Sequence, residues 1–94
     1  MNHEETVRQL GGFGKCKAMV GASFSKGENK LYMRFKGSRK LNSAVITLNS
    51  MDTYDIEFSK ATVKGLQNVQ NVNGVYCDML KETFEKTTGL YLSF

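Results

Sequence analysis

Apolar positions in the first ten residues follow the spacing of a short helix. Asn2 and Glu5 form a capping-box pair, in which each side chain can bond a main-chain amide that the first turn leaves without a partner. Val7 and Leu10 are three residues apart and therefore share one helical face. Two glycines then interrupt the pattern. It predicts a helix over residues 3–10 that needs packing against the rest of the chain to persist.

Beyond residue 14 the apolar positions change to the period of two that is typical of strands. Cys16, Ala18, Val20 and Ala22 alternate with Lys15, Lys17 and Met19, which predicts a first strand. The same alternation recurs at residues 31–36 and 54–58, and residues 44–48 are apolar and rich in β-branched side chains. Residues 66–72 form a weaker fifth candidate. Turn signals separate these segments at residues 25–29, 37–40, 49–52 and 63–65.

The C-terminal segment returns to helical spacing. Its predicted buried stripe falls at i, i+3, i+4, i+7 and i+8, namely Tyr76, Met79, Leu80, Thr83 and Phe84. Asn73 is expected to cap the start of this helix, and Gly89 to end it in the left-handed conformation. The apolar tail at residues 91–94 is expected to pack against the core.

Together these patterns predict an α+β fold: a short N-terminal helix, a four- to five-stranded antiparallel meander sheet, and a C-terminal helix covering one face. With 94 residues the chain is expected to form one small domain, residues 1–94. This length excludes a large dinucleotide-binding sheet or a deep cavity with a second lobe. No apolar run approaches the ~18–20 residues that cross a bilayer. The polar start at residues 1–5 is unlike a secretory signal, so we expect a cytoplasmic protein without membrane contact.

The net charge of +4 originates in one third of the chain. Residues 15–40 hold eight Lys or Arg against a single acid, which gives this segment +7 and leaves −3 for the remainder. Charge clustered in this way is a candidate footprint for an anionic partner. The candidate binding residues are Lys15, Lys17, Lys26, Lys30, Tyr32, Arg34, Lys36, Arg39 and Lys40.

Residues 30–36 interleave Tyr32 with three cations on the polar side of a predicted strand. Lys15 and Lys17 would share one face of the preceding strand and extend this surface. Such a surface can neutralise phosphates while the tyrosine stacks on a base or sugar. It can equally meet an acidic protein surface, or be a solvated face whose cations balance Asp55 and Glu57. The aromatic pattern of an RNA-recognition motif is absent.

Other reactive side chains carry weaker patterns. His3 stands alone near a terminus that we expect to be mobile, and Cys16 is placed in the core by its alternation, leaving two free thiols with Cys77. Asp52, Asp55 and Glu57 could hold a metal, but cross-strand pairing with cations is the plainer use. The glycines at residues 11–14 lack the spacing of a phosphate-binding loop. We therefore predict no catalytic residues, no metal site and no cofactor.

Three stretches resemble a family of small, uncharacterised proteins from bacteriophages, prophages and other mobile elements. They are Gln9-Leu10-Gly11-Gly12; Ile46-Thr47-Leu48 with Asp52-Thr53-Tyr54-Asp55-Ile56-Glu57-Phe58; and Gly74-Val75-Tyr76-Cys77-Asp78-Met79-Leu80 running to Thr88-Gly89-Leu90-Tyr91. The resemblance covers nearly the whole chain. That family usually has Gly-Ala-Lys in place of Gly21-Ala22-Ser23, and its loop after Phe35 is often longer. The resemblance implies a bacterial cytoplasm under mobile-element control and lends no catalytic residue.

Small mobile-element proteins of this kind often bind and disable host machinery such as CRISPR effector complexes or restriction enzymes. Many such inhibitors are acidic mimics of nucleic acid. This chain is basic and would instead bind guide RNA, DNA or an acidic groove of a protein. We therefore expect an inhibitor or modulator of a host protein or nucleoprotein complex. The alternatives are a stand-alone nucleic-acid-binding accessory protein and a small Cys- or metal-dependent hydrolase. Exposed edge strands would also let two copies pair as a homodimer.

Overall fold

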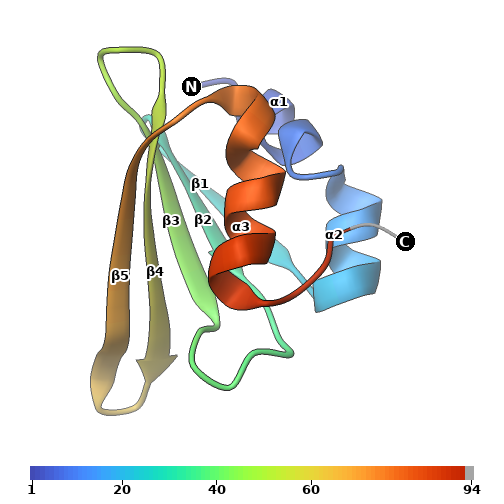
Figure 1. The fold of residues 1–94 in the computed structure, drawn as a ribbon, viewed down its shortest axis with the longest axis vertical. Coiled ribbons are helices and arrows are strands. Elements are labelled where there is room, and N and C mark those ends of the chain that lie inside the picture. The colour runs from blue at the N-terminus through green and yellow to red at the C-terminus, as the bar shows by residue number, and fades with distance from the viewer. Residues whose placement is uncertain (93–94) are drawn as a thin grey trace.

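The computed structural model describes residues 1–92 and consists of two layers, a sheet and a group of helices on one of its faces (Figure 1). The fold is α+β, as predicted: N-terminal helices, a five-stranded antiparallel meander and a C-terminal helix. The elements are α1 (His3–Gln9), α2 (Phe13–Val20), β1 (Ser23–Gly27), β2 (Lys30–Arg34), β3 (Ser43–Leu48), β4 (Tyr54–Thr62), β5 (Gly65–Val75), the short 3-10 helix η1 (Cys77–Met79) and α3 (Leu80–Thr88).

The strands follow chain order across the sheet, so β1 and β5 are its two edges. Side chains from alternate positions of β2, β3 and β4 point to the helical layer and form the core with both helical ends of the chain. Phe84 of α3 lies at its centre, edge-to-face with Phe35 at 4.9 Å between ring centroids. The opposite face of the sheet has no helix over it (Figure 1). No helix within residues 1–92 has the length and apolar character to cross a membrane.

The prediction of an N-terminal helix is confirmed. The side chain of Asn2 accepts a hydrogen bond from the Glu5 amide at 3.1 Å, which is the expected cap. The helix persists because it is docked: the buried Thr6 hydroxyl lies 3.2 Å from the Tyr54 hydroxyl on β4. Tertiary contact therefore supplies what a helix this short lacks alone.

The predicted first strand is wrong, because most of that segment forms α2 and β1 begins only at Ser23. Cys16 and Val20 are both buried, and their spacing of four fits a helix as well as it fits alternation. Ala18, by contrast, is exposed. Gly21 ends the helix in the left-handed conformation with φ of 62°, a stop signal of the kind expected for Gly89. The residues of β1 had in part been interpreted as a turn, which in fact occupies only positions 28 and 29.

The C-terminal prediction is confirmed in part. The fifth strand is the longest in the sheet and runs to Val75, so Asn73 lies within it and caps no helix. Leu80 and Phe84 are buried as expected, whereas Tyr76 and Met79 precede α3 and are exposed. Gly89 ends α3 with φ of 76°, the left-handed conformation predicted for it. Leu92 is buried but Tyr91 is exposed, and residues 93–94 lie outside the described part of the tail.

Candidate binding surface

The exposed side chains of β2 form a short row on the open face of the sheet. Lys30, Tyr32 and Arg34 face away from the helices, while Leu31 and Met33 between them are buried in the core. We call these three exposed residues the ladder. The strand predicted here is confirmed, and its alternation places an aromatic ring, 43% exposed, between two cations. Within residues 1–92 neither cation lies in an ion pair.

Hydroxyl side chains border the ladder on both neighbouring strands. The register of the sheet places them directly across from ladder residues: Ser23 and Ser43 opposite Arg34, Ser25 opposite Tyr32, and Thr47 opposite Lys30. Serine and threonine hydroxyls donate hydrogen bonds to phosphate oxygens as well as to protein groups. These hydroxyl residues are not among the predicted binding residues, although the alternation of Ser23 and Ser25 around Phe24 was a signal for them.

Gly27 positions the Tyr32 ring. A Cβ atom on Gly27 would lie only 2.8 Å from Cε2 of Tyr32, because the ring leans over this glycine from the neighbouring strand. Covering a glycine at a sheet edge with a cross-strand aromatic ring is a known stabilising arrangement. Any side chain at position 27 would displace the ring, so Gly27 fixes how the ladder presents its aromatic group.

Asp55 and Glu57 lie on the same face, two strands away from the ladder. With Lys30 and Tyr32 they line a shallow depression of about 310 Å³ that reaches Asn71 on β5. The predicted cross-strand pairing of these acids with cations is wrong. The ion pair found within residues 1–92 joins Arg8 to Glu5 on α1 and involves neither of these acids. Asp55 instead accepts hydrogen bonds from the Gly74 amide at 3.0 Å and from Nδ2 of Asn49 at 3.2 Å. Asp55 thereby ties the loop before β4 to the end of β5. The open face has a cationic half on β2 and an acidic half on β4.

The other predicted binding residues do not join the ladder. Lys15 and Lys17 belong to α2 in the helical layer, so the prediction that they extend the same sheet face is wrong. Lys26 on β1 is paired with the buried Leu31 and points to the helical side. Lys36 lies against Gly21 at the end of α2, and Arg39 and Lys40 belong to the loop between β2 and β3. The cations of residues 15–40 are thus spread around the β1 edge of the sheet and do not share one face.

No family model, no curated protein and no solved structure matches this chain. Among residues 1–92 no three His, Cys, Asp or Glu side chains gather as metal ligands would.

His3 has a structural position. Its Nε2 atom lies 2.8 Å from the Gly27 carbonyl oxygen and 3.0 Å from that of Lys30, so this nitrogen carries the proton and donates to both. The expectation of a mobile terminus is wrong here, because these contacts tie α1 to the β1–β2 hairpin. The ladder is thereby anchored at the end where the hairpin turns.

The two cysteines differ in environment. Cys16 is buried in the core, as predicted, and its thiol lies 3.7 Å from the Leu10 carbonyl oxygen. Burial raises the pKa of the Cys16 thiol above its usual 9.0, which makes it a poor nucleophile. Cys77 is exposed beyond the end of β5.

Proposed function

We propose that this chain is a binding protein that inhibits or modulates a host nucleoprotein or nuclease complex in a bacterial cytoplasm, using the ladder to contact nucleic acid in that complex. The observation that carries the proposal is the row formed by Lys30, Tyr32 and Arg34, exposed together on a sheet face that has no helical cover. The mobile-element setting rests on the resemblance of the three sequence stretches given above.

The ladder has the chemistry of a small single-strand platform. Lys30 and Arg34 are four residues apart, so they lie about 13 Å from each other along β2. Cations at this separation can contact phosphates on either side of a nucleotide whose base stacks on Tyr32. Base–aromatic stacking needs no particular sequence, and the bordering hydroxyls can donate to sugar or phosphate oxygens.

The acidic half of the face argues for a nucleoprotein target over free nucleic acid. Asp55 and Glu57 repel phosphates from β4, which confines the contact to β1, β2 and β3. The affinity of non-specific nucleic-acid binding rises with the number of phosphates that the protein neutralises. Two phosphate contacts therefore contribute little affinity at physiological salt. Useful affinity must then include contacts with protein, whose own cations the acidic half can meet.

A matched pair of charge-reversal variants tests this proposal. Lys30→Glu with Arg34→Glu alters the ladder, and Lys15→Glu with Lys17→Glu makes the same change of net charge on α2. Tagged proteins are incubated with bacterial lysate, with and without nuclease, and retained complexes are identified by mass spectrometry. We expect the wild type and the α2 variant to retain one nucleoprotein or nuclease complex, and the ladder variant to lose at least about 90% of it.

Two outcomes would contradict the proposal. Retention that survives reversal of the ladder would place the interface elsewhere. Equal binding of the isolated chain to random-sequence RNA and DNA, with a steep decline in added salt, would favour the stand-alone accessory protein.

A further inference from the structure

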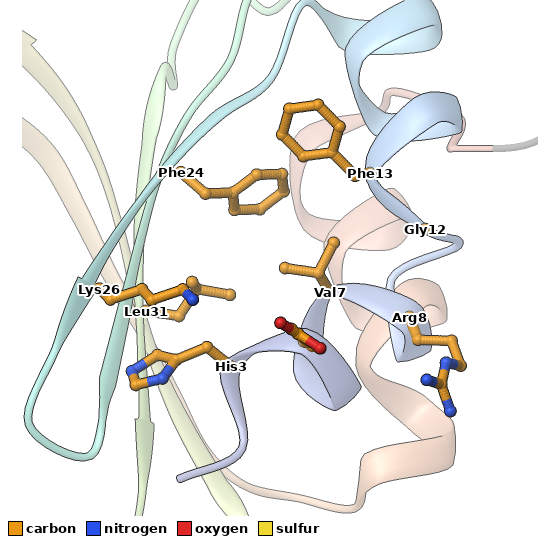
Figure 2. Close-up of a pocket in the computed structure, with 9 residues that line it drawn as sticks. His3, Val7, Arg8, Gly12, Phe13, Phe24, Lys26 and Leu31 are labelled. Atoms are coloured by element: carbon orange, nitrogen blue, oxygen red, sulfur yellow. The ribbon is translucent and has the colours of Figure 1, made fainter.

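A second surface lies on the other side of the sheet, where β1 meets the helical layer. A cleft of about 420 Å³ opens between β1, α1 and the start of α2 (Figure 2). Its apolar lining comes from Val7, Phe13, Phe24 and Leu31. The Phe13 and Phe24 rings approach each other from α2 and β1 at 6.0 Å between centroids. Phe13 is 57% exposed, so its ring presents apolar surface at the mouth of the cleft.

The same cleft is bordered by an open strand edge. Gly27 and Lys30 flank a two-residue turn, and the β1–β2 register is regular along all five residues. The Leu48 amide donates to the Asn29 carbonyl and the Phe35 amide to the Asn42 carbonyl, so odd-numbered residues of β2 bond to β3 and even-numbered ones bond to β1. Phe24 and Lys26 lie opposite the odd-numbered Met33 and Leu31, so their main-chain groups point away from β2. No other element within residues 1–92 donates to or accepts from them. These are also the two β1 residues whose side chains line the cleft.

We infer that this cleft binds an extended peptide segment of a partner protein, which adds to the sheet as a sixth strand along β1. Strand addition obtains affinity from main-chain hydrogen bonds and specificity from pockets that receive alternate side chains. Both features are present at β1. The inference does not depend on the ladder, which lies on the opposite face.

Charge and spacing define the peptide. The side chain that faces Phe24 would enter the apolar cleft, so it is aromatic or large and aliphatic. The side chain two residues away would face Lys26, which has no ion-pair partner within residues 1–92, and an acidic residue fits there. Arg8 is already bonded to Glu5 at 2.8 Å, and the remaining charged residue on α1 is Glu4. An acid is therefore favoured beside β1 and disfavoured beside α1.

A second copy of the chain fits this edge poorly. Antiparallel pairing of β1 with itself would direct the Lys26 ammonium of each copy into the apolar cleft of the other. It would also bring two basic segments, each of charge +7, against each other. A small apolar molecule would fill the cleft but leave the strand edge without partners. The extended peptide is the occupant that satisfies both.

Selection of random octapeptides from a display library on the wild-type protein tests this inference. We expect enriched peptides to share an aromatic or large aliphatic residue two positions from Asp or Glu. A synthetic copy of the most enriched peptide is then titrated by fluorescence anisotropy. Backbone amide spectra by NMR locate its contact and show that each variant is folded.

Three substitutions of Lys26 separate the main-chain contact from the side-chain contact. Lys26→Arg retains both charge and amide, so affinity should stay within about twofold. Lys26→Gln removes the charge, and Lys26→Pro removes the charge and the outward amide while leaving the bonds to β2 intact. We expect Lys26→Pro to bind roughly tenfold more weakly than Lys26→Gln. Phe13→Ala, at an exposed position, should also weaken binding about tenfold.

Several results would overturn the inference. These are no enriched peptide, equal affinity of the Pro and Gln variants, or no effect of Phe13→Ala. Spectral changes at β1 that follow the concentration of the protein alone would assign the edge to a second copy. Binding of toluene with an affinity unaffected by Lys26→Pro, in the absence of peptide binding, would assign the cleft to small apolar molecules.

Discussion

The two edges of the sheet are built in opposite ways. β1 is short and pairs with β2 in an unbroken register, and one of its sides belongs to an apolar cleft. β5 is eleven residues long, carries no charged residue and is exposed along almost its whole length. Its register against β4 shifts twice, each time with an extra residue on β5, and the non-glycine Asn68 there has φ of 55°.

The two edges therefore differ in how readily each can pair with a strand of another chain. A long, uncharged edge is the kind that pairs with other chains, and bulges are one means by which proteins prevent such pairing. β5 carries two of them, whereas β1 carries none. The homodimer by strand addition therefore has little support at β5. The structure leaves β1 as the regular edge, and it is the edge with a cleft beside it.

The largest contrast should be in stability, between β2, the strand next to the first edge, and β5. Leu31, opposite β1, is 1% exposed, so Leu31→Ala should lower the free energy of unfolding by about 2–5 kcal/mol. Leu66 on β5 is 58% exposed, and Leu66→Ala should change it by less than about 0.5 kcal/mol. Urea unfolding measures both. Similar losses would mean that β5 is packed as firmly as β2, the strand next to the first edge.

The bulge at Asn68 can be tested by its backbone conformation. Valine is strained in the left-handed region, so Asn68→Val should destabilise the protein by about 1–2 kcal/mol. Asn68→Gly should be neutral or slightly stabilising, because glycine adopts this conformation without strain. Thermal unfolding of the two variants gives the difference. If valine is tolerated as well as glycine, β5 has no bulge at this position.

A double-mutant cycle measures the coupling between Gly27 and Tyr32 at the first edge. Gly27→Ala should cost about 1 kcal/mol, because the added methyl displaces the Tyr32 ring. In a Tyr32→Ala background the same change should be neutral or stabilising, since alanine is better than glycine in a strand. Urea unfolding of the four proteins gives the coupling energy. A coupling near zero would show that Gly27 does not position the ring.

The smallest predicted effect is a difference between the two thiols in the pH dependence of stability. The unfolded chain ionises Cys16 near its usual pKa of 9.0, whereas the folded chain keeps the thiol neutral to higher pH. Stability from Cys16 is therefore complete below pH 9.0 and is lost as pH rises above it, by less than about 1.4 kcal/mol per pH unit. Urea unfolding between pH 8 and 10 should show a shallower decline for Cys16→Ala than for Cys77→Ala. Equal declines would contradict this.

The strands with one buried face could be predicted from sequence because a two-residue period leaves little choice of register. β2 is the clearest case, and its ladder was found with it. The helix α2 could not, because buried residues four apart fit the period of a helix and that of a strand equally well. The cleft was missed for the same reason. It exists only because Phe13 lies on a helix and faces Phe24, two residues that no local pattern connects.

The salt dependence of binding to the retained nucleoprotein tests most directly whether the ladder contacts phosphates. Its dissociation constant is measured between about 50 and 200 mM NaCl for the wild type and for the Lys30→Gln, Arg34→Gln variant. If the ladder neutralises two phosphates of a single strand, the logarithmic slope of the binding constant should be about 1.4 units less negative in the variant. An identical slope in the two proteins would show that Lys30 and Arg34 contact no phosphate, and would contradict the account.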